Sequence, residues 1–170
     1  MVIWDTNILA RYFGGKLDKD DQVRMDGLVA LMRSKREPIG IPAQVWAEFL
    51  DAASEDEMLE SQSLMKTNAF RFLPYDMRAA VETVDVSRAG RAARKAMKGK
   101  VRERQAVKVD WQIIAIAKVH SARLLLTNDS DMQTEAMRSG IACCSIADLE
   151  IPDALRQRAI EYEETHPEQP

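Results

Sequence analysis

The chain has 170 residues, of which 46% are hydrophobic and 30% are charged, and its formal net charge is −3. These proportions match ordinary globular proteins and exclude a largely disordered chain. No apolar run approaches the ~20 residues that a membrane span requires. The first ten residues also lack the basic leader of a signal peptide, so we expect a cytoplasmic protein with no membrane association.

In chain order, short apolar runs with the length of buried strands alternate with longer stretches of helical spacing. The expected strands cover residues 2–4, 39–41, 124–127 and 141–145. The expected helices include one around Met25, Leu28 and Met32, one near residues 58–70 and one over residues 109–120. Strands separated by helices predict an α/β fold with a central parallel sheet that helices cover on both faces.

The domain organisation is simple, because the chain contains no internal repeat and no Gly/Ser-rich or Pro-rich linker. We expect one domain over residues 1–149. Residues 150–170 carry six acidic residues and two arginines, and we expect them to form an acidic C-terminal helix or tail.

Acidic residues occur where the predicted strands end. Asp5 follows the first strand, Glu48 lies about two turns into the helix after the second, and Asp129 and Asp131 follow the third. Asp110 stands at the expected start of the helix over residues 109–120. Because ligands bind beyond the carboxyl ends of parallel strands, we expect these carboxylates to converge.

Each of these acids also has a purely structural interpretation. Asp5 and Asp110 suit the N-cap of a helix, and Glu48 suits a solvent-facing position. Asp129 and Asp131 lie in a sequence of turn-forming residues. The order of the acids along the chain, rather than any one of them, therefore favours a site.

A cluster of carboxylates requires a cation, because two unit charges about 5 Å apart repel by roughly 3 kcal/mol at an effective dielectric constant of about 20. Hard oxygen ligands favour Mg²⁺ or Mn²⁺. Such ions activate water and neutralise charge on a phosphodiester, so the expected reaction is phosphodiester hydrolysis.

The other reactive residue types offer little material for catalysis. The only histidines are His120 and His166, which leaves few groups for a Ser-His or Cys-His mechanism. Cys143 and Cys144 are adjacent in an apolar run, a spacing that suits neither a disulfide nor zinc, and we interpret them as buried strand residues. The three tryptophans each lie within two residues of a candidate acid, where core packing is favoured over base stacking.

The segment from Arg88 to Lys108 holds nine basic residues and one acid. A basic segment of this kind can neutralise several phosphates, although, taken alone, a solvated helix face is the favoured interpretation. We expect contacts with an RNA substrate from residues here and beside the first acid: Thr6, Asn7, Arg91, Arg94, Lys98 and Arg102.

Four stretches, taken in order, resemble the PIN domain family and in particular its VapC-type toxins. They cover residues 2–9 (Val-Ile-Trp-Asp-Thr-Asn-Ile-Leu), 41–48, 110–117 and 125–129. The resemblance spans about residues 1–149. It implies a three-layer sandwich with a central parallel sheet, and cleavage of RNA that depends on Mg²⁺ or Mn²⁺.

Carried over by position, the resemblance assigns catalysis and metal binding to Asp5, Glu48, Asp110 and Asp129, with Thr6 supporting the first acid. Asp131 is the alternative to Asp129 as fourth acid, and Asp129 is preferred because it fits a Thr-x-Asp pattern. The resemblance also implies a homodimer and a small antitoxin partner. Two features depart from the compact family pattern. The basic segment is unusually dense, and the motifs do not account for the acidic tail.

Two other function classes stay open. The first is a catalytically inactive PIN-like module that binds RNA or protein through residues 88–108. The second is a phosphotransfer enzyme in which Asp5 is the nucleophile and Asp129 holds magnesium, but that scheme gives Glu48 no role.

Overall fold

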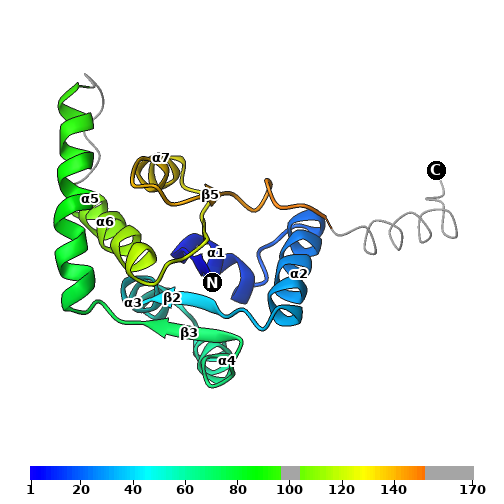
Figure 1. Ribbon diagram of the computed structural model, residues 1–170. Coiled ribbons are helices and arrows are strands. Elements are labelled where there is room, and N and C mark those ends of the chain that lie inside the picture. The colour runs from blue at the N-terminus through cyan, green and yellow to red at the C-terminus, as the bar shows by residue number, and fades with distance from the viewer. Residues whose placement is uncertain (97–103, 152–170) are drawn as a thin grey trace, which may run out of the picture.

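The computed structural model describes residues 1–96 and 104–151, and the side chains of residues 1–92 and 106–151. Its centre is a five-stranded sheet in the order β3-β2-β1-β4-β5, in which every pairing is parallel (Figure 1). The strands are β1 (Val2–Trp4), β2 (Ile39–Pro42), β3 (Phe70–Leu73), β4 (Leu124–Leu126) and β5 (Cys143–Cys144). The predicted α/β fold with a parallel sheet is confirmed.

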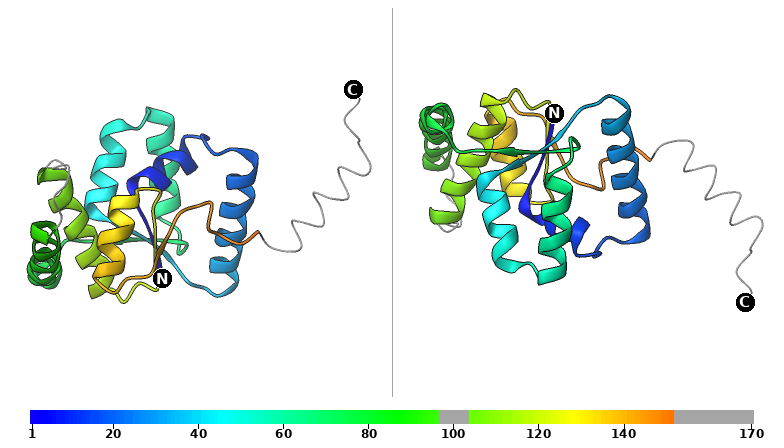
Figure 2. Two further views of the ribbon diagram at one scale, coloured as in Figure 1. Left: turned by 90° about the horizontal axis from the view of Figure 1, so that it is seen from above. Right: turned by 90° about the horizontal axis from the view of Figure 1, so that it is seen from below.

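Seven helices connect these strands within the described residues. They are α1 (Thr6–Phe13), α2 (Lys19–Ser34), α3 (Ala43–Ala52), α4 (Glu55–Met65), α5 (Met77–Ala96), α6 (Arg104–Val119) and α7 (Ser130–Arg138). α1 packs against α3 and α4, whereas α5, α6 and α7 pack against one another. Figure 2 shows this second group on one side of the molecule and α2 on the other. No described helix has both the length and the apolar character needed to cross a bilayer.

Two expectations about the elements are wrong. The helix expected near residues 58–70 ends at Met65, and Phe70 begins a strand, β3. This strand was missed because it is short, lies at the sheet edge and exposes Arg71 and Phe72. The helix that carries Asp110 begins at Arg104, inside the basic segment, so Asp110 lies within α6 rather than at its start. A helix cap therefore does not explain this acid.

The strand order places a topological switch point at the centre of the sheet. The chain leaves β1 toward β2 on one side, and β4 later pairs with the other side of β1. In open α/β sheets the crevice at such a point is the usual ligand site. Asp5 directly follows β1, and Asp129 follows β4 closely, so both acids lie at this crevice.

The core beneath this crevice is aromatic and aliphatic. Trp4 is fully buried, with its ring centroid 5.1 Å from that of Tyr12 and 5.7 Å from that of Phe70, both in edge-on geometry. Trp111 is also buried, and Trp46 stacks on Phe49. The tryptophans therefore pack in or against the core, as expected from the sequence.

The packing of α5 against α6 and α7 depends on one glycine. A Cβ atom at Gly90 would lie 2.7 Å from Trp111 Nε1 and 2.8 Å from Glu135 Oε2. Trp111 Nε1 donates a hydrogen bond of 3.3 Å to the same Glu135 oxygen, and Arg138 pairs with the other oxygen at 2.8 Å. Gly90 thus lets the helix pass directly over a buried polar contact that joins the residue after Asp110 to α7.

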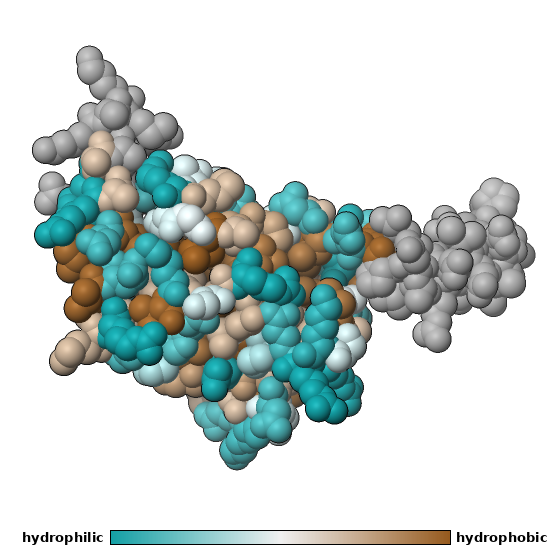
Figure 3. Space-filling model, viewed as in Figure 1, coloured by the Kyte–Doolittle hydropathy of each residue, from teal (hydrophilic) through white to brown (hydrophobic). Residues whose placement is uncertain are grey.

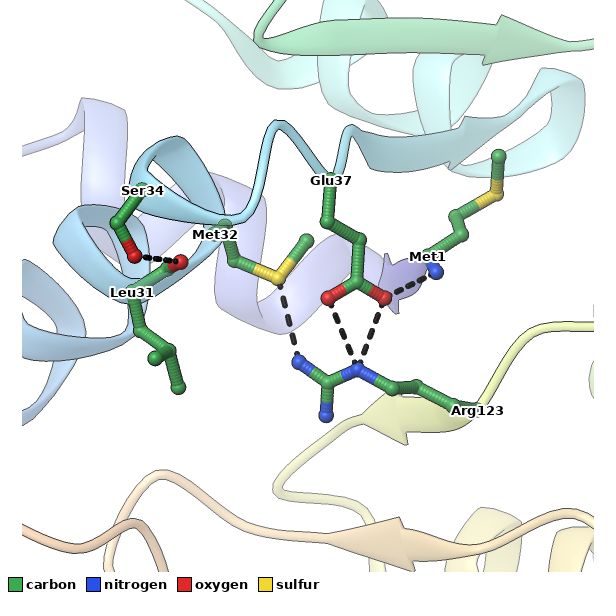
Figure 4. Close-up of polar contacts among 6 residues, drawn as sticks. All are labelled: Met1, Leu31, Met32, Ser34, Glu37 and Arg123. Carbon is green, nitrogen blue, oxygen red and sulfur yellow. Dashed lines mark hydrogen bonds and ion pairs between the residues drawn. The ribbon is translucent and has the colours of Figure 1, made fainter.

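At the amino-terminal edge of the sheet, three charged groups meet (Figure 4). Glu37 accepts hydrogen bonds from Arg123 Nε at 2.8 and 3.0 Å and pairs with the α-amino group of Met1. Arg123 Nη2 also lies 3.5 Å from Met32 Sδ. The hydrogen bond from Arg123, followed by the contact with the N-terminus, lowers the pKa of the Glu37 carboxyl below its ordinary value of 4.5.

We expect Glu37→Gln to lower the free energy of unfolding by about 1–2 kcal/mol at pH 7, because it removes charge-assisted hydrogen bonds that are partly exposed. The Glu37 carboxylate contributes stability above pH 4.5, its ordinary pKa. That contribution is lost as the pH falls through the lower pKa of the folded state. Urea unfolding of both proteins at several pH values measures the difference, with Glu60→Gln on the exposed side of α4 as control. A difference that grows as the pH falls below 4.5 would contradict this assignment.

Candidate active site

An open groove of about 690 Å³ lies beyond the carboxyl ends of β1 and β4. Its walls come from α1, α3, α6 and the loop that leads into α7. Four of the predicted acids line it: Asp5, Glu48, Asp110 and Asp129. No lysine or arginine stands among the described residues that line the groove. The structure therefore brings together carboxylates that are up to 124 positions apart in the sequence (129 − 5).

Asp5 is a buried acid with hydrogen bonds to both of its carboxylate oxygens. It is 7% exposed, follows β1 directly and is the N-cap of α1. Its Oδ1 accepts a hydrogen bond from the Thr6 backbone N–H at 2.8 Å, and its Oδ2 accepts one from Thr127 Oγ1 at 2.6 Å. Asn7 Nδ2 donates a further bond of 2.6 Å to Oδ2. Asp5 therefore caps the helix and also lines the groove, so the two interpretations of this residue are compatible.

The hydrogen bonds to Asp5 continue into the loop after β4. Asn7 Nδ2 also donates to Thr127 Oγ1 at 3.0 Å, and the backbone N–H of Asn128 donates to Asn7 Oδ1 at 3.0 Å. Thr127 Oγ1 accepts a further bond from the Asp129 N–H at 3.1 Å. This network fixes the loop that carries Asp129 relative to the loop that carries Asp5.

Glu48 reaches the groove from α3. It lies six residues into the helix, and its Oε2 accepts a hydrogen bond of 2.7 Å from Thr6 Oγ1. Gln44, one turn earlier on the same face, also lines the groove, and its Nε2 donates to Gln112 Oε1 on α6 at 3.2 Å. This bond connects the helix that carries Glu48 to the helix that carries Asp110.

Asp110 enters the groove from the opposite wall. It is 7% exposed and lies on the face of α6 that also presents Val109 and Ile113 to the groove. Asp110 is therefore a buried carboxylate in the middle of a helix, a position that aspartate rarely occupies.

Asp129 and Asp131 occupy different surroundings. Asp129 lines the groove and is the N-cap of α7, where its Oδ1 accepts from the backbone N–H groups of Asp131 and Met132 at 2.8 and 3.0 Å. Asp131 is exposed in the first turn of α7 and does not line the groove. The structure thus places only the preferred candidate for the fourth acid beside the other three.

Burial raises the pKa of Asp5 above its ordinary value of 3.8, and the charges of Glu48 and Asp129 raise it further. The hydrogen bonds from Thr127 and Thr6 oppose this effect and favour the charged form. Burial likewise raises the pKa of the Cys143 thiol to about 12, so this residue is a poor nucleophile. Cys143 and Cys144 both lie in a strand as predicted, but they are half-buried rather than fully buried.

The donor set fits a hard divalent cation in type and charge, because it consists of carboxylate oxygens that repel one another. The four carboxylates are, however, farther apart than the ligands of a bound ion. Among the described residues, no three acidic, histidine or cysteine side chains are grouped closely enough to hold an ion together. The hydrogen bond from Thr6 orients the Glu48 carboxylate through Oε2 and makes no use of Oε1.

The predicted substrate-binding residues fall into three groups. Thr6 and Asn7 line the groove. Arg91 is exposed on α5 with its guanidinium 5.8 Å from the centre of the Trp111 ring, beside Asp110 in sequence. Arg94 belongs to α5, but its side chain lies outside the described residues, as do Lys98, Arg102 and the tail over residues 152–170.

Sequence reasoning missed three polar residues that shape the groove: Gln44, Thr127 and Asn128. A signal existed for two of them. Gln44 precedes Glu48 by one helical turn, and Thr127 begins the Thr-x-Asp pattern that selected Asp129. Asn128 offered no such signal, because its role depends on hydrogen bonds with Asn7 and with the backbone N–H of Ile146 at 3.1 Å.

The fold and the groove together define a class: an all-parallel, five-stranded α/β protein with a carboxylate-lined groove at its topological switch point. Two solved structures share this fold. One is VapBC2 from Rickettsia felis bound to a DNA fragment from its promoter, at TM-score 0.60 and 13% identity, which covers 85% of this chain and 98% of the other. The second is DNA-bound VapBC from Salmonella typhimurium, at TM-score 0.59 and 19% identity, which covers 85% and 97%. The PIN-like fold that the sequence motifs imply is confirmed.

No protein-family model matches the chain. No curated protein sequence matches it either. The similarity between this chain and the VapBC structures is therefore a similarity of fold.

Proposed function

We propose that this protein is a cytoplasmic, metal-dependent endoribonuclease of the PIN type and the toxin of a toxin-antitoxin pair. The observation that carries the proposal is the groove, in which four acids from four separate segments meet at the carboxyl edge of the sheet. The fold shared with VapBC complexes supports the same function. The products are expected to carry 5′-phosphate and 3′-hydroxyl ends.

Asp5, Glu48, Asp110 and Asp129 would hold Mg²⁺ or Mn²⁺, which supplies a Lewis acid that neutralises charge on the phosphodiester. The chain's own residues do the positioning. Thr127 and Asn7 hold Asp5 in one orientation through two bonds of 2.6 Å. These bonds already use Asp5 Oδ2, which does not favour the alternative in which Asp5 attacks phosphorus as a nucleophile.

The site binds its substrate next to a surface that attracts phosphate. Arg88, Arg91 and Lys108 are exposed on α5 and α6, and α6 also forms one wall of the groove. RNA that follows these helices would bring a phosphodiester to the acids, with the cations offsetting the repulsion between substrate and groove.

We expect Arg91→Ala to weaken RNA binding and to reduce the slope of log K against log salt by about 1, because one phosphate contact is lost. Fluorescence anisotropy with a labelled single-stranded RNA, without metal and at several salt concentrations, measures this slope. Arg33→Ala on α2 serves as control, since it removes one exposed charge far from α5 in sequence. Equal slopes for Arg91→Ala and the unchanged protein would remove Arg91 from the RNA-binding surface.

A homodimer and an antitoxin partner are part of the same proposal. Met77, Val81 and Val84 are 83%, 64% and 45% exposed at helical spacing on α5, and Figure 3 shows hydrophobic side chains over this helix. Exposed apolar stripes of this kind favour association between proteins. The VapBC structures are complexes of two kinds of protein, which supports an antitoxin for this chain.

Digestion of a defined RNA pool by the purified chain, freed of any bound partner, tests the proposal. We expect cleavage with Mg²⁺ or Mn²⁺, no cleavage with EDTA, and loss of cleavage in Asp110→Asn. If RNA binds without metal but neither ion supports cleavage, the chain is instead the inactive binding module.

A further inference from the structure

A second groove, of about 630 Å³, lies between α2 and the segment 148–150. Apolar side chains dominate its lining, among them Leu28, Leu31, Leu124 and Leu149. It borders the start of β4, whereas the acidic groove lies beyond the end of that strand. Leu31 is 43% exposed within it, which leaves a large apolar side chain open to water.

The groove has a basic end. Arg123 lines it, and Glu37 holds this side chain in place (Figure 4). Ser34, the last residue of α2, also lines the groove, and Arg33, Lys35 and Arg36 surround it in sequence with exposed side chains. A ligand for this surface needs an apolar side and acidic residues near one end of it.

The rest of this chain has that pattern. Glu150 lines the groove, and residues 152–170 follow at once. Ile151, Leu155, Ala159 and Tyr162 are spaced four, four and three residues apart, a spacing typical of one side of an α-helix. The acids Glu161, Glu163 and Glu164 come at the far end of this stretch.

We propose that residues 152–170 bind back into the groove between α2 and the segment 148–150, with Leu155 against Leu31 and the acidic end toward Arg33, Lys35 and Arg36. The reach is sufficient, because about 12 helical residues span roughly 18 Å and the eight residues of α2 from Gly27 to Ser34 span roughly 12 Å. The attachment at Glu150 also gives the segment a high effective concentration, so weak contacts suffice. This proposal is independent of the nuclease assignment.

A double-mutant cycle in the full-length chain tests the contact, with Leu31→Asp, Leu155→Asp and the pair, each followed by thermal unfolding. We expect each single substitution to lower the midpoint by roughly 2–4 °C and the pair to lower it by no more than the larger single change. The control cycle pairs Leu155→Asp with Leu59→Asp on α4, where Leu59 is 67% exposed and outside the groove, and is expected to be additive.

Repeating the cycle over a tenfold range of protein concentration separates the possible occupants. If the tail binds within its own chain, the departure of the double mutant from additivity is the same at the lowest and the highest protein concentration. Coupling that appears only at the higher concentration would show that a second copy occupies the groove, and would overturn the proposal. Additive effects of Leu31→Asp and Leu155→Asp would overturn it as well, because the purified chain then leaves the groove open for a separate partner.

Discussion

Replacing Asp5 with asparagine is expected to reduce metal-dependent RNA cleavage by at least ~100-fold, since even the outer partners of metal ligands contribute about 10–100-fold to affinity or activity. Asp5 accepts hydrogen bonds on both oxygens, from Thr6 on one and from Thr127 on the other. Asparagine keeps a single acceptor and loses the charge, so both the ion and the network around Asp5 are affected.

Circular dichroism and the unfolding midpoint establish that Asp5→Asn is folded before cleavage rates are compared. Asp110→Asn provides a second test on a different helix, with the same expected loss. Asp51→Asn removes an equal charge from the exposed end of α3, outside the groove, and should cleave like the unchanged protein. Cleavage by Asp5→Asn at one-tenth of the normal rate or more would be incompatible with the proposed site.

Trp4→Ala is expected to destabilise the fold by about 3–5 kcal/mol, the usual range for deleting a large aromatic side chain from a core. Trp4 is fully buried on the central strand and packs edge-on against Tyr12 and Phe70. Its removal leaves a cavity below the switch point and removes the indole ring that lies between Tyr12 of α1 and Phe70 of β3, so that the direct contact of Phe13 with Phe70, at 6.1 Å between ring centroids, remains.

Chemical denaturation measures this loss, and Trp4→Phe is the matched control. Phenylalanine retains an aromatic ring and eliminates the indole N–H, for which no described residue serves as acceptor. We therefore expect Trp4→Phe to lose less than half as much stability as Trp4→Ala. A loss below about 1 kcal/mol for Trp4→Ala would mean that the aromatic cluster contributes little to the core.

The sequence predicted those parts of the site that depend on local pattern. Asp5 and Asp129 follow strands whose apolar runs are unmistakable, and parallel strands necessarily end at a common edge. Glu48 was identified because a helix had to follow the strand that ends at Pro42. The sequence alone therefore indicates that four acids lie at one edge of the sheet.

Features that depend on tertiary contacts could not be predicted in this way. β3 lies at the sheet edge with two adjacent exposed residues, Arg71 and Phe72, between two buried ones, so it lacks the alternation typical of a strand. Its four residues are also too few for periodicity to distinguish strand from helix. α6 starts inside a basic segment whose residues give no apolar signal, so the position of Asp110 within its helix was misjudged. The hydrogen bond between Gln44 and Gln112 joins side chains 68 positions apart, so no local sequence pattern predicts it.

The central position of β1 affects how the groove forms during synthesis. Asp5 and Glu48 are made early, but β1 acquires its second neighbour only when β4 has been translated. A nascent chain that ends before Leu124 contains neither Asp129 nor the Thr127 hydroxyl that holds Asp5. The acidic groove is therefore incomplete in such a nascent chain, and any activity that depends on the groove would begin only after β4 and the loop that follows it have joined β1.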